Sequence, residues 1–142
     1  MRRTSTRFAA LLTVVLTPAT LRGEPSPPLA RFEVVAPPTV RAGTIFEVSL
    51  TPAEPVARDL PLRVDWLETT NATPPTGRVG WREVADPHAA RPRIVATMKA
   101  GDAAGPATME GQGRYHTCRG DLCVLHVGRV HVETFVTPSA TR

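Results

Sequence analysis

The residues with the most informative chemistry are two cysteines near the C-terminal end of the 142-residue chain. Cys118 and Cys123 enclose the four residues 119–122, Arg-Gly-Asp-Leu, in which glycine and aspartate favour a turn. If the cysteines face each other across a β-hairpin, their Cα atoms lie about 4.5–5.5 Å apart, which permits a disulfide. A ring this small contributes only about 2 kcal/mol by the loop-entropy relation. Such a bond can open without unfolding its domain, so it suits either thiol–disulfide exchange or a local structural staple.

Strand alternation decides which neighbours share a face with the two cysteines. With Cys118 opposite Cys123, His116 lies on the cysteine face, where a nearby imidazolium would favour the thiolate. His126 lies on the opposite face, so a zinc site made of both histidines and both cysteines could not close without a bulge. The other histidines and the methionines show no spacing typical of a copper site. We therefore expect no metal and no cofactor.

The cysteines belong to a longer pattern, GQGRYHTCRGDLC at residues 111–123, of the form Gly-x-x-x-Tyr-x-x-Cys, a few residues, then Cys. This pattern is similar to the amino-terminal periplasmic domain of the DsbD family of thiol:disulfide interchange proteins, and to related all-β modules attached to bacterial thioredoxin-like proteins. Upstream of the hairpin the resemblance extends only to the number of strands. Residues 124–126, Val-Leu-His, replace the proline-containing segment of the family, and its acidic pair and aromatic cap loop are not identified here.

The resemblance implies an immunoglobulin-like redox module that exchanges electrons with an exported thioredoxin-like or membrane thiol:disulfide protein. Cys123 then corresponds to the cysteine that forms the mixed disulfide, and Cys118 resolves it. Tyr115 corresponds to the aromatic residue before the pair and, with His116, is expected to shield the site or tune its thiol pKa. Thiol:disulfide interchange would be the enzymatic activity. The alternative is a non-catalytic immunoglobulin-like binding or structural domain with an inert disulfide, and a third class is an exported metal-binding protein.

Short segments of alternating apolar residues predict the elements that position the cysteine pair. Period-two alternation is typical of half-buried strands, and the 15 prolines disfavour long helices. About seven strands result, with a loop at 68–77 and turns at 86–92 and 101–106. An all-β, immunoglobulin-like antiparallel β-sandwich is the fold class that this spacing indicates. The predicted strands are 32–36, 44–50, 60–66, 78–84 (the weakest), 94–98, 107–117 and 122–136.

The first 23 residues have the features of a secretory signal peptide. Arg2, Arg3 and Arg7 precede an apolar run at residues 8–16, which is shorter than the roughly 20 residues that span a bilayer. We therefore expect a periplasmic or secreted bacterial protein. In such an oxidising compartment the two cysteines of a domain usually form a disulfide. The predicted organisation is a signal peptide at 1–23, a proline-rich lead-in at 24–30, the sandwich domain at 31–137 and a disordered tail at 138–142.

The net charge of +4 belongs mostly to the predicted signal peptide. Arg2, Arg3, Arg7 and Arg22 are four of the 17 basic residues, and all 13 acidic residues lie at or after Glu24. The chain from Glu24 onwards therefore carries 13 side chains of each sign. Nucleic-acid binding needs a concentrated basic patch, which this balance does not supply. We expect a monomer whose partner is a protein and not a nucleic acid.

Overall fold

The computed structural model describes residue 23 and residues 26–140 of the chain. The predicted signal peptide, apart from its last residue, lies outside the described residues, as do two residues of the lead-in and two of the tail. Within the described part of the chain, no helix is long and apolar enough to cross a membrane.

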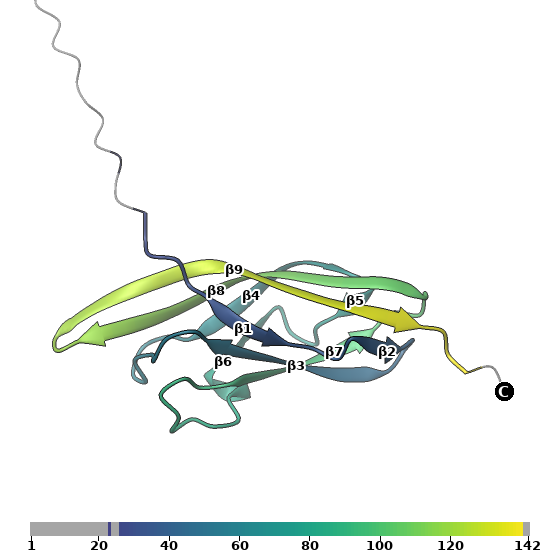
Figure 1. Ribbon diagram of the computed structural model, residues 1–142, viewed down its shortest axis with the longest axis horizontal. Helices are drawn as coiled ribbons and strands as arrows, with labels where there is room; N and C mark the ends of the chain where they lie inside the picture. The colour runs from purple at the N-terminus through teal and green to yellow at the C-terminus, as the bar shows by residue number, and fades with distance from the viewer. Residues whose placement is uncertain (1–22, 24–25, 141–142) are drawn as a thin grey trace, which may run out of the picture.

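Strands in two packed sheets make up the described fold (Figure 1). Their orders are β1-β3-β7-β5 and β2-β9-β8-β4-β6. The first sheet is built from β1 (Phe32–Val35), β3 (Ile45–Pro52), β7 (Ile94–Ala100) and β5 (Ala72–Thr73). The second is built from β2 (Thr39–Arg41), β9 (Leu122–Thr137), β8 (Gly105–Arg119), β4 (Arg63–Thr70) and β6 (Arg78–Gly80). All pairs of these strands are antiparallel except β2–β9, which is parallel.

This topology confirms the predicted all-β, immunoglobulin-like sandwich. β1, β3 and β7 are neighbours in one sheet and β4, β8 and β9 in the other, which is the A-B-E and C-F-G arrangement of immunoglobulin domains. The core lies between the sheets, because every second residue of the long strands points inward. Val48 and Leu50 of β3, Ile94 of β7, and Met109 of β8 are fully buried. Phe46, Val48 and Leu50, at every second position of the strand predicted at 44–50, therefore share its inward face.

The strand count differs from the prediction of about seven, because the structure has nine strands within the described residues. β2 was not predicted, and β5 lies inside the segment 68–77 that was predicted as a loop. These strands have three and two residues, too few to establish an alternating pattern. The weak candidate at 78–84 is a strand only in β6, because Trp81–Glu83 form a single turn of 3-10 helix.

The β8–β9 hairpin reaches beyond the rest of its sheet. β8 and β9 pair from Gly105–Val136 to Arg119–Leu122, whereas β4 pairs with β8 only as far as Arg114. The two strands therefore continue beyond the end of β4, and residues 115–126 of this hairpin are called the arm. Figure 1 shows it projecting at the left end of the molecule. The arm carries both cysteines.

The end of the predicted lead-in is joined to the outer edge of β9 at the root of the arm. The Val127 N–H donates to Pro28 O at 3.1 Å, and the Ala30 N–H donates to Val127 O at 3.0 Å. Ala30 is buried, and a Cβ atom on Gly128 would lie 2.0 Å from its carbonyl oxygen. The sheet thus begins before residue 31, and Gly128 permits that close approach.

Candidate functional site

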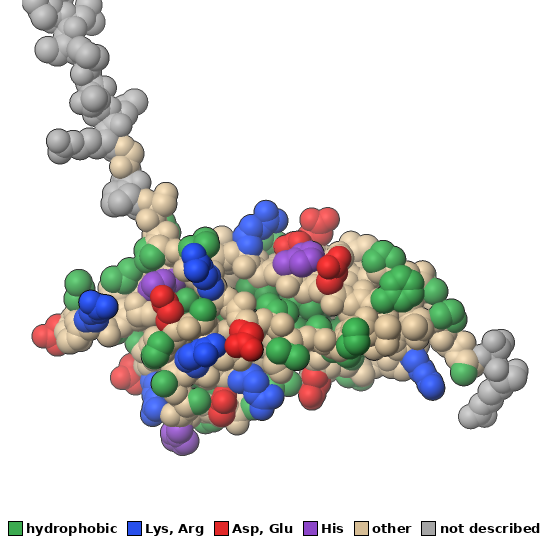
Figure 2. All heavy atoms as spheres, in the orientation of Figure 1, with side chains coloured by type: hydrophobic (Ala, Val, Ile, Leu, Met, Phe, Trp, Pro, Cys, Tyr) green, Lys and Arg blue, Asp and Glu red, His purple; other side chains and the backbone are tan. Residues whose placement is uncertain are grey.

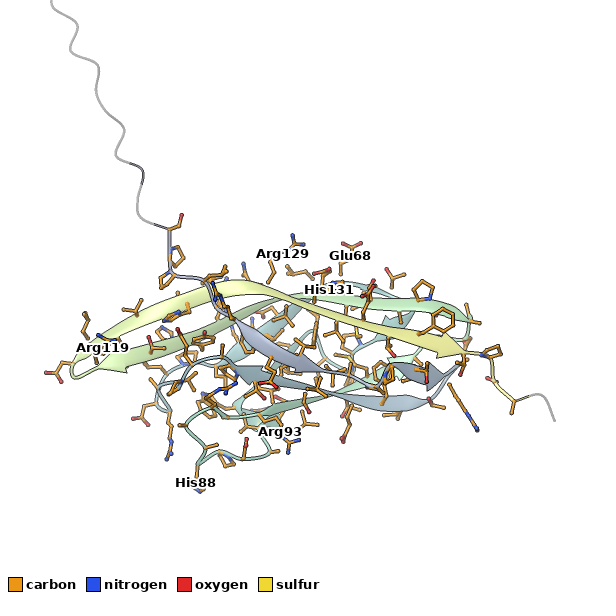
Figure 3. The ribbon with its side chains drawn as sticks, in the orientation of Figure 1. Glu68, His88, Arg93, Arg119, Arg129 and His131 are labelled. Carbon is orange, nitrogen blue, oxygen red and sulfur yellow. A yellow bond between two sulfur atoms is a disulfide. The ribbon has the colours of Figure 1, made fainter. Side chains whose placement is uncertain are left out.

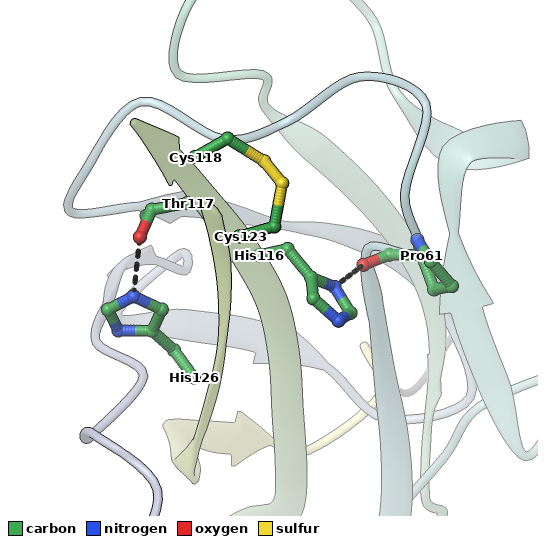
Figure 4. Close-up of a disulfide and its surroundings, with 6 residues drawn as sticks. All are labelled: Pro61, His116, Thr117, Cys118, Cys123 and His126. Atoms are coloured by element: carbon green, nitrogen blue, oxygen red, sulfur yellow. Dashed lines mark hydrogen bonds between the residues drawn. A yellow bond between two sulfur atoms is a disulfide. The ribbon is translucent and has the colours of Figure 1, made fainter. Parts of the chain in front are cut away.

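The two cysteines form a disulfide near the tip of the arm (Figure 4). Arg119, the residue after Cys118, is labelled at this tip in Figure 3. Cys118 and Cys123 are directly opposed in the β8–β9 ladder, as predicted, and their Cα atoms are 4.0 Å apart, which is closer than expected. Both residues are exposed to solvent. The bond is therefore accessible to another thiol.

The turn beyond the disulfide is tighter than predicted. The ladder continues for one more pair, Arg119–Leu122, so only Gly120 and Asp121 connect the strands. Gly120 has φ +56°, a conformation that two-residue hairpin turns require at their first central position and that glycine adopts without steric cost. The four enclosed residues are thus two strand residues and a two-residue turn, and the disulfide lies against regular backbone on both sides.

His116 lies on the same face of the arm as the disulfide, as strand alternation predicts (Figure 4). It is two residues from Cys118 along β8, a spacing of about 7 Å. Its Nδ1 atom is 3.5 Å from Pro61 O, and His116 is directly opposed to Leu125 in the ladder. A small hollow of about 160 Å³ lies beside this face, and its lining includes Pro61, His116 and Leu125. The imidazole is thus placed near the disulfide but not against it.

Tyr115 lies on the opposite face of the hairpin, where it is fully buried. Its ring stacks on His126 with centroids 5.0 Å apart and meets Phe32 edge-on at 5.5 Å. Its hydroxyl accepts the Arg31 N–H at 3.3 Å and donates to Glu54 Oε2 at 3.4 Å. These contacts fasten the arm to the start of β1 and to the segment after β3. Any influence of Tyr115 on the disulfide must therefore pass through the hairpin itself, since its ring is on the other side.

Burial raises the pKa of the Tyr115 phenol above its ordinary value of 10.0, because the phenolate is poorly solvated there. The Arg31 backbone N–H opposes this rise by hydrogen bonding to the oxygen, and the negative charge of Glu54 adds to it. Tyr115 is therefore a neutral hydrogen-bonding group at the root of the arm under ordinary conditions.

His126 completes a polar hollow of about 460 Å³ on this second face. Its Nε2 atom is 2.8 Å from Thr117 Oγ1 (Figure 4), and its Nδ1 atom is 3.6 Å from Glu54 Oε2. His116 and His126 point to opposite faces, so the two histidines and two cysteines do not converge as metal ligands. Within the described residues, no group of three or more histidine, cysteine or acidic side chains is placed to hold a metal ion.

Several residues of the site were not selected from the sequence. Arg31 and Glu54 meet Tyr115 from positions 84 and 61 residues away, and no local pattern signals contacts of that range. The exposed apolar side chains of the arm, Leu122, Val124 and Leu125, were also missed. Leu122 is 71% exposed. Leu122 and Val124 continue the alternation of the buried residues of β9, and the projection of the arm beyond the sandwich leaves them in solvent, whereas Leu125 lies on the cysteine face.

Exposed apolar side chains thus lie on both faces of the arm near the disulfide. Figure 2 shows hydrophobic side chains along this end of the molecule. No family model matches the sequence, and no curated protein does either. Function is therefore inferred from the geometry of the arm and from the residue pattern around the cysteines.

Proposed function

We propose that this protein is an exported thiol:disulfide exchange module whose Cys118–Cys123 pair cycles between disulfide and dithiol. The single observation that carries the proposal is the position of the bond: an exposed disulfide on a two-stranded arm that lies outside the core. A buried bond between the sheets would be closed to another thiol. The Cys118–Cys123 bond is accessible from solvent, and its small ring contributes only about 2 kcal/mol to the stability of the fold.

The reaction is a two-step exchange with a partner dithiol. A partner thiolate attacks Cys123 Sγ, the bond to Cys118 breaks, and Cys118 leaves as a thiolate. The second partner thiol then attacks the mixed disulfide, which releases Cys123. Two electrons and two protons have moved: the partner is oxidised to a disulfide and this chain is reduced to a dithiol. The reverse sequence passes the electrons to the next exported protein.

Three further features support this function. The pattern at residues 111–123 resembles the redox-active domain of the DsbD family. By this resemblance Cys123 corresponds to the cysteine that is attacked by the partner thiolate. The predicted signal peptide places the chain where such exchange operates. The exposed apolar side chains near the bond, Leu125 on its face and Leu122 and Val124 on the other face, offer contact surface of a kind that is typical of protein interaction sites.

The residues beside the pair take separate roles in this proposal. His116 shares the face of the sulfurs and, when protonated, favours the thiolate that forms on reduction. Tyr115 acts as a positioning residue, because its ring and hydroxyl fix the root of the arm. The partner is an exported thioredoxin-like or membrane thiol:disulfide protein.

A second function is favoured by the exposed apolar residues alone. An arm that is held rigid by an inert disulfide could present Leu122 and Val124 to a binding partner with no redox chemistry. In that case the disulfide would be a staple and the protein a non-catalytic binding domain. The reduction potential of the pair separates the two functions.

The first experiment is thiol trapping of the purified protein equilibrated in glutathione buffers. An exchange module is expected to have a reduction potential of roughly −230 to −120 mV, the range of exchange-competent pairs. A potential below about −300 mV would identify a structural disulfide and leave the binding domain as the function.

Replacing both cysteines gives an independent test. The double variant Cys118→Ser, Cys123→Ser is expected to lose all exchange with a thioredoxin-like protein while the free energy of unfolding falls by only about 2 kcal/mol. Urea denaturation measures the second quantity. A much larger fall would assign the bond to stability.

A further inference from the structure

Along β9, successive residues alternate in the direction of their main-chain N–H and C=O groups. One residue bonds to β8, and the next turns both groups to the outer edge of the strand. Val127 turns both its N–H and its C=O outward, where they bind Pro28 and Ala30. In an antiparallel ladder the outward positions recur at every second residue. Leu125 and Cys123 therefore also turn their N–H and C=O groups outward. Among the described residues, no backbone group from outside the hairpin bonds to either of them.

The edge of β8 is occupied at His116, two residues before Cys118. His116 is the corresponding outward position there, and its carbonyl oxygen accepts the Ala57 N–H at 2.8 Å. The imidazole of His116 is 3.5 Å from Pro61 O in the same connecting segment. At the His116–Leu125 pair the arm thus has one covered edge, on β8, and one edge, on β9, that the described residues leave open. Among the described residues, no backbone group from outside the hairpin bonds to either cysteine.

This asymmetry matters because exchange requires the entering sulfur to approach in line with the bond that breaks. The cysteines are directly opposed, so their S–S bond runs across the arm from β8 to β9. Attack on Cys123 Sγ comes from the side away from Cys118, which is the side of β9 and its open edge. Attack on Cys118 Sγ comes from the side of β8, whose edge the segment with Ala57 and Pro61 contacts at His116.

We propose that the redox partner docks by adding an extended, cysteine-bearing segment to the outer edge of β9, with its cysteine opposite Cys123. This inference rests on the proposed exchange function and names the surface and the kind of partner that the function uses. An added strand lies about 4.8 Å from β9, and a residue that is hydrogen-bonded opposite Cys123 has its Cα atom about 5.5 Å away. That separation lies inside the range in which disulfides form.

The docked geometry also determines the course of the reaction. The partner thiolate forms a bond to Cys123 Sγ, the Cys118–Cys123 bond breaks, and Cys118 Sγ carries away the electron pair. The partner is a dithiol protein, and its second thiol later resolves the mixed disulfide and completes its oxidation. Main-chain hydrogen bonds to Cys123 and Leu125 fix the register of the added segment on β9. Its side chains alternate between the two faces of the arm, where they meet Val124 on one face and Leu125 on the other. The matching partner segment is therefore extended and apolar beside its cysteine.

A matched pair of variants separates the main-chain edge from the side chain. Leu125→Pro removes the outward N–H, and proline is tolerated on an edge strand where its N–H would face solvent. Leu125→Ala removes the same side chain and keeps the N–H. Each protein is reduced by a bacterial thioredoxin and, separately, by dithiothreitol, which needs no edge. The measured quantity is the ratio of the two rate constants.

The expected result is a fall in this ratio of at least tenfold for Leu125→Pro and less than threefold for Leu125→Ala. Equal ratios for the two variants would overturn edge docking. Far-UV circular dichroism checks that each variant keeps its sheets.

Trapping on the unaltered protein tests the same proposal without any change to the fold. A thioredoxin whose resolving cysteine is replaced by serine stops the reaction at the mixed disulfide, and peptide mass mapping locates the bond. Attachment at Cys123 is expected. Attachment at Cys118 would overturn the docking proposal and leave the exchange function standing, whereas the absence of any exchange, with either cysteine, would remove both.

Discussion

At the residue scale, Tyr115 links the arm to the sandwich through a hydroxyl shared between two distant segments. It donates to Glu54, accepts from the Arg31 backbone and stacks on His126. The sequence predicted the cysteine pair and the face of His116, since both follow from alternation within one hairpin. It could not predict Arg31 and Glu54 as partners of Tyr115, because those contacts depend on how separate strands pack.

Because the pKa of Tyr115 is raised, the free energy of unfolding is expected to depend on pH in the alkaline range. The native state holds the phenolic proton more tightly than the unfolded state, whose tyrosine ionises near pH 10. This contribution is therefore fully present below about pH 10 and is lost as the pH rises through the higher native pKa. Tyr115→Phe is expected to remove that part of the pH dependence, measured by urea denaturation at successive pH values.

An optical titration checks the cause directly. Tyr115 is the only tyrosine in the chain, so the ultraviolet absorbance of ionised tyrosine reports this residue alone. Ionisation at an ordinary pKa of 10 in the folded protein would contradict the desolvated environment described for the phenol.

At the element scale, β9 is the strand on which the site depends. It pairs with β8 along its whole length, with β2 near its end and with residues 28–30 at the root of the arm. The sequence predicted the long alternating strands well, because their inward faces repeat over many residues. It missed β2 and β5, which have only three and two residues. These segments are strands because they pair with β9 and β7, and their own sequences are too short to show an alternating pattern.

Gly128→Ala tests the junction between residues 28–30 and β9. The added Cβ atom would lie 2.0 Å from Ala30 O, so the backbone must separate. We expect a loss of about 1–3 kcal/mol in the free energy of unfolding, the usual range for overpacking, and faster amide hydrogen exchange at Ala30 and Val127. Gly77→Ala is the matched control, since nothing lies within 4 Å of its added Cβ atom. Equal effects of the two substitutions would show that the close approach is unimportant.

At the scale of the whole molecule, the core and the reactive bond occupy different regions. The buried residues of β3 and β7 lie in the sandwich, whereas both cysteines lie on the arm beyond the last β4 pair. The sandwich class could be predicted because it follows from strand number and spacing. The projection of the arm could not, because it depends on where β4 ends relative to β8.

Reduction of the disulfide should therefore leave the sandwich unchanged. Backbone amide chemical shifts are expected to change on reduction only in residues 114–127 and the segment against them, while those of Val48, Leu50 and Ile94 stay the same. Two-dimensional NMR of the oxidised and reduced protein makes this comparison. Shift changes spread through β3 and β7 would show that the bond is coupled to the core.

The pairing of residues 28–30 with β9 also bears on how the chain acquires its fold. Residues 28–30 and β9 lie side by side although about 100 residues separate them in the sequence, so this part of the sheet cannot form until β9 has been synthesised. Long-range pairings of this kind fold slowly, whereas a hairpin forms from one continuous stretch. The β8–β9 hairpin can therefore assemble, and its thiols can meet, before the two ends of the chain come together.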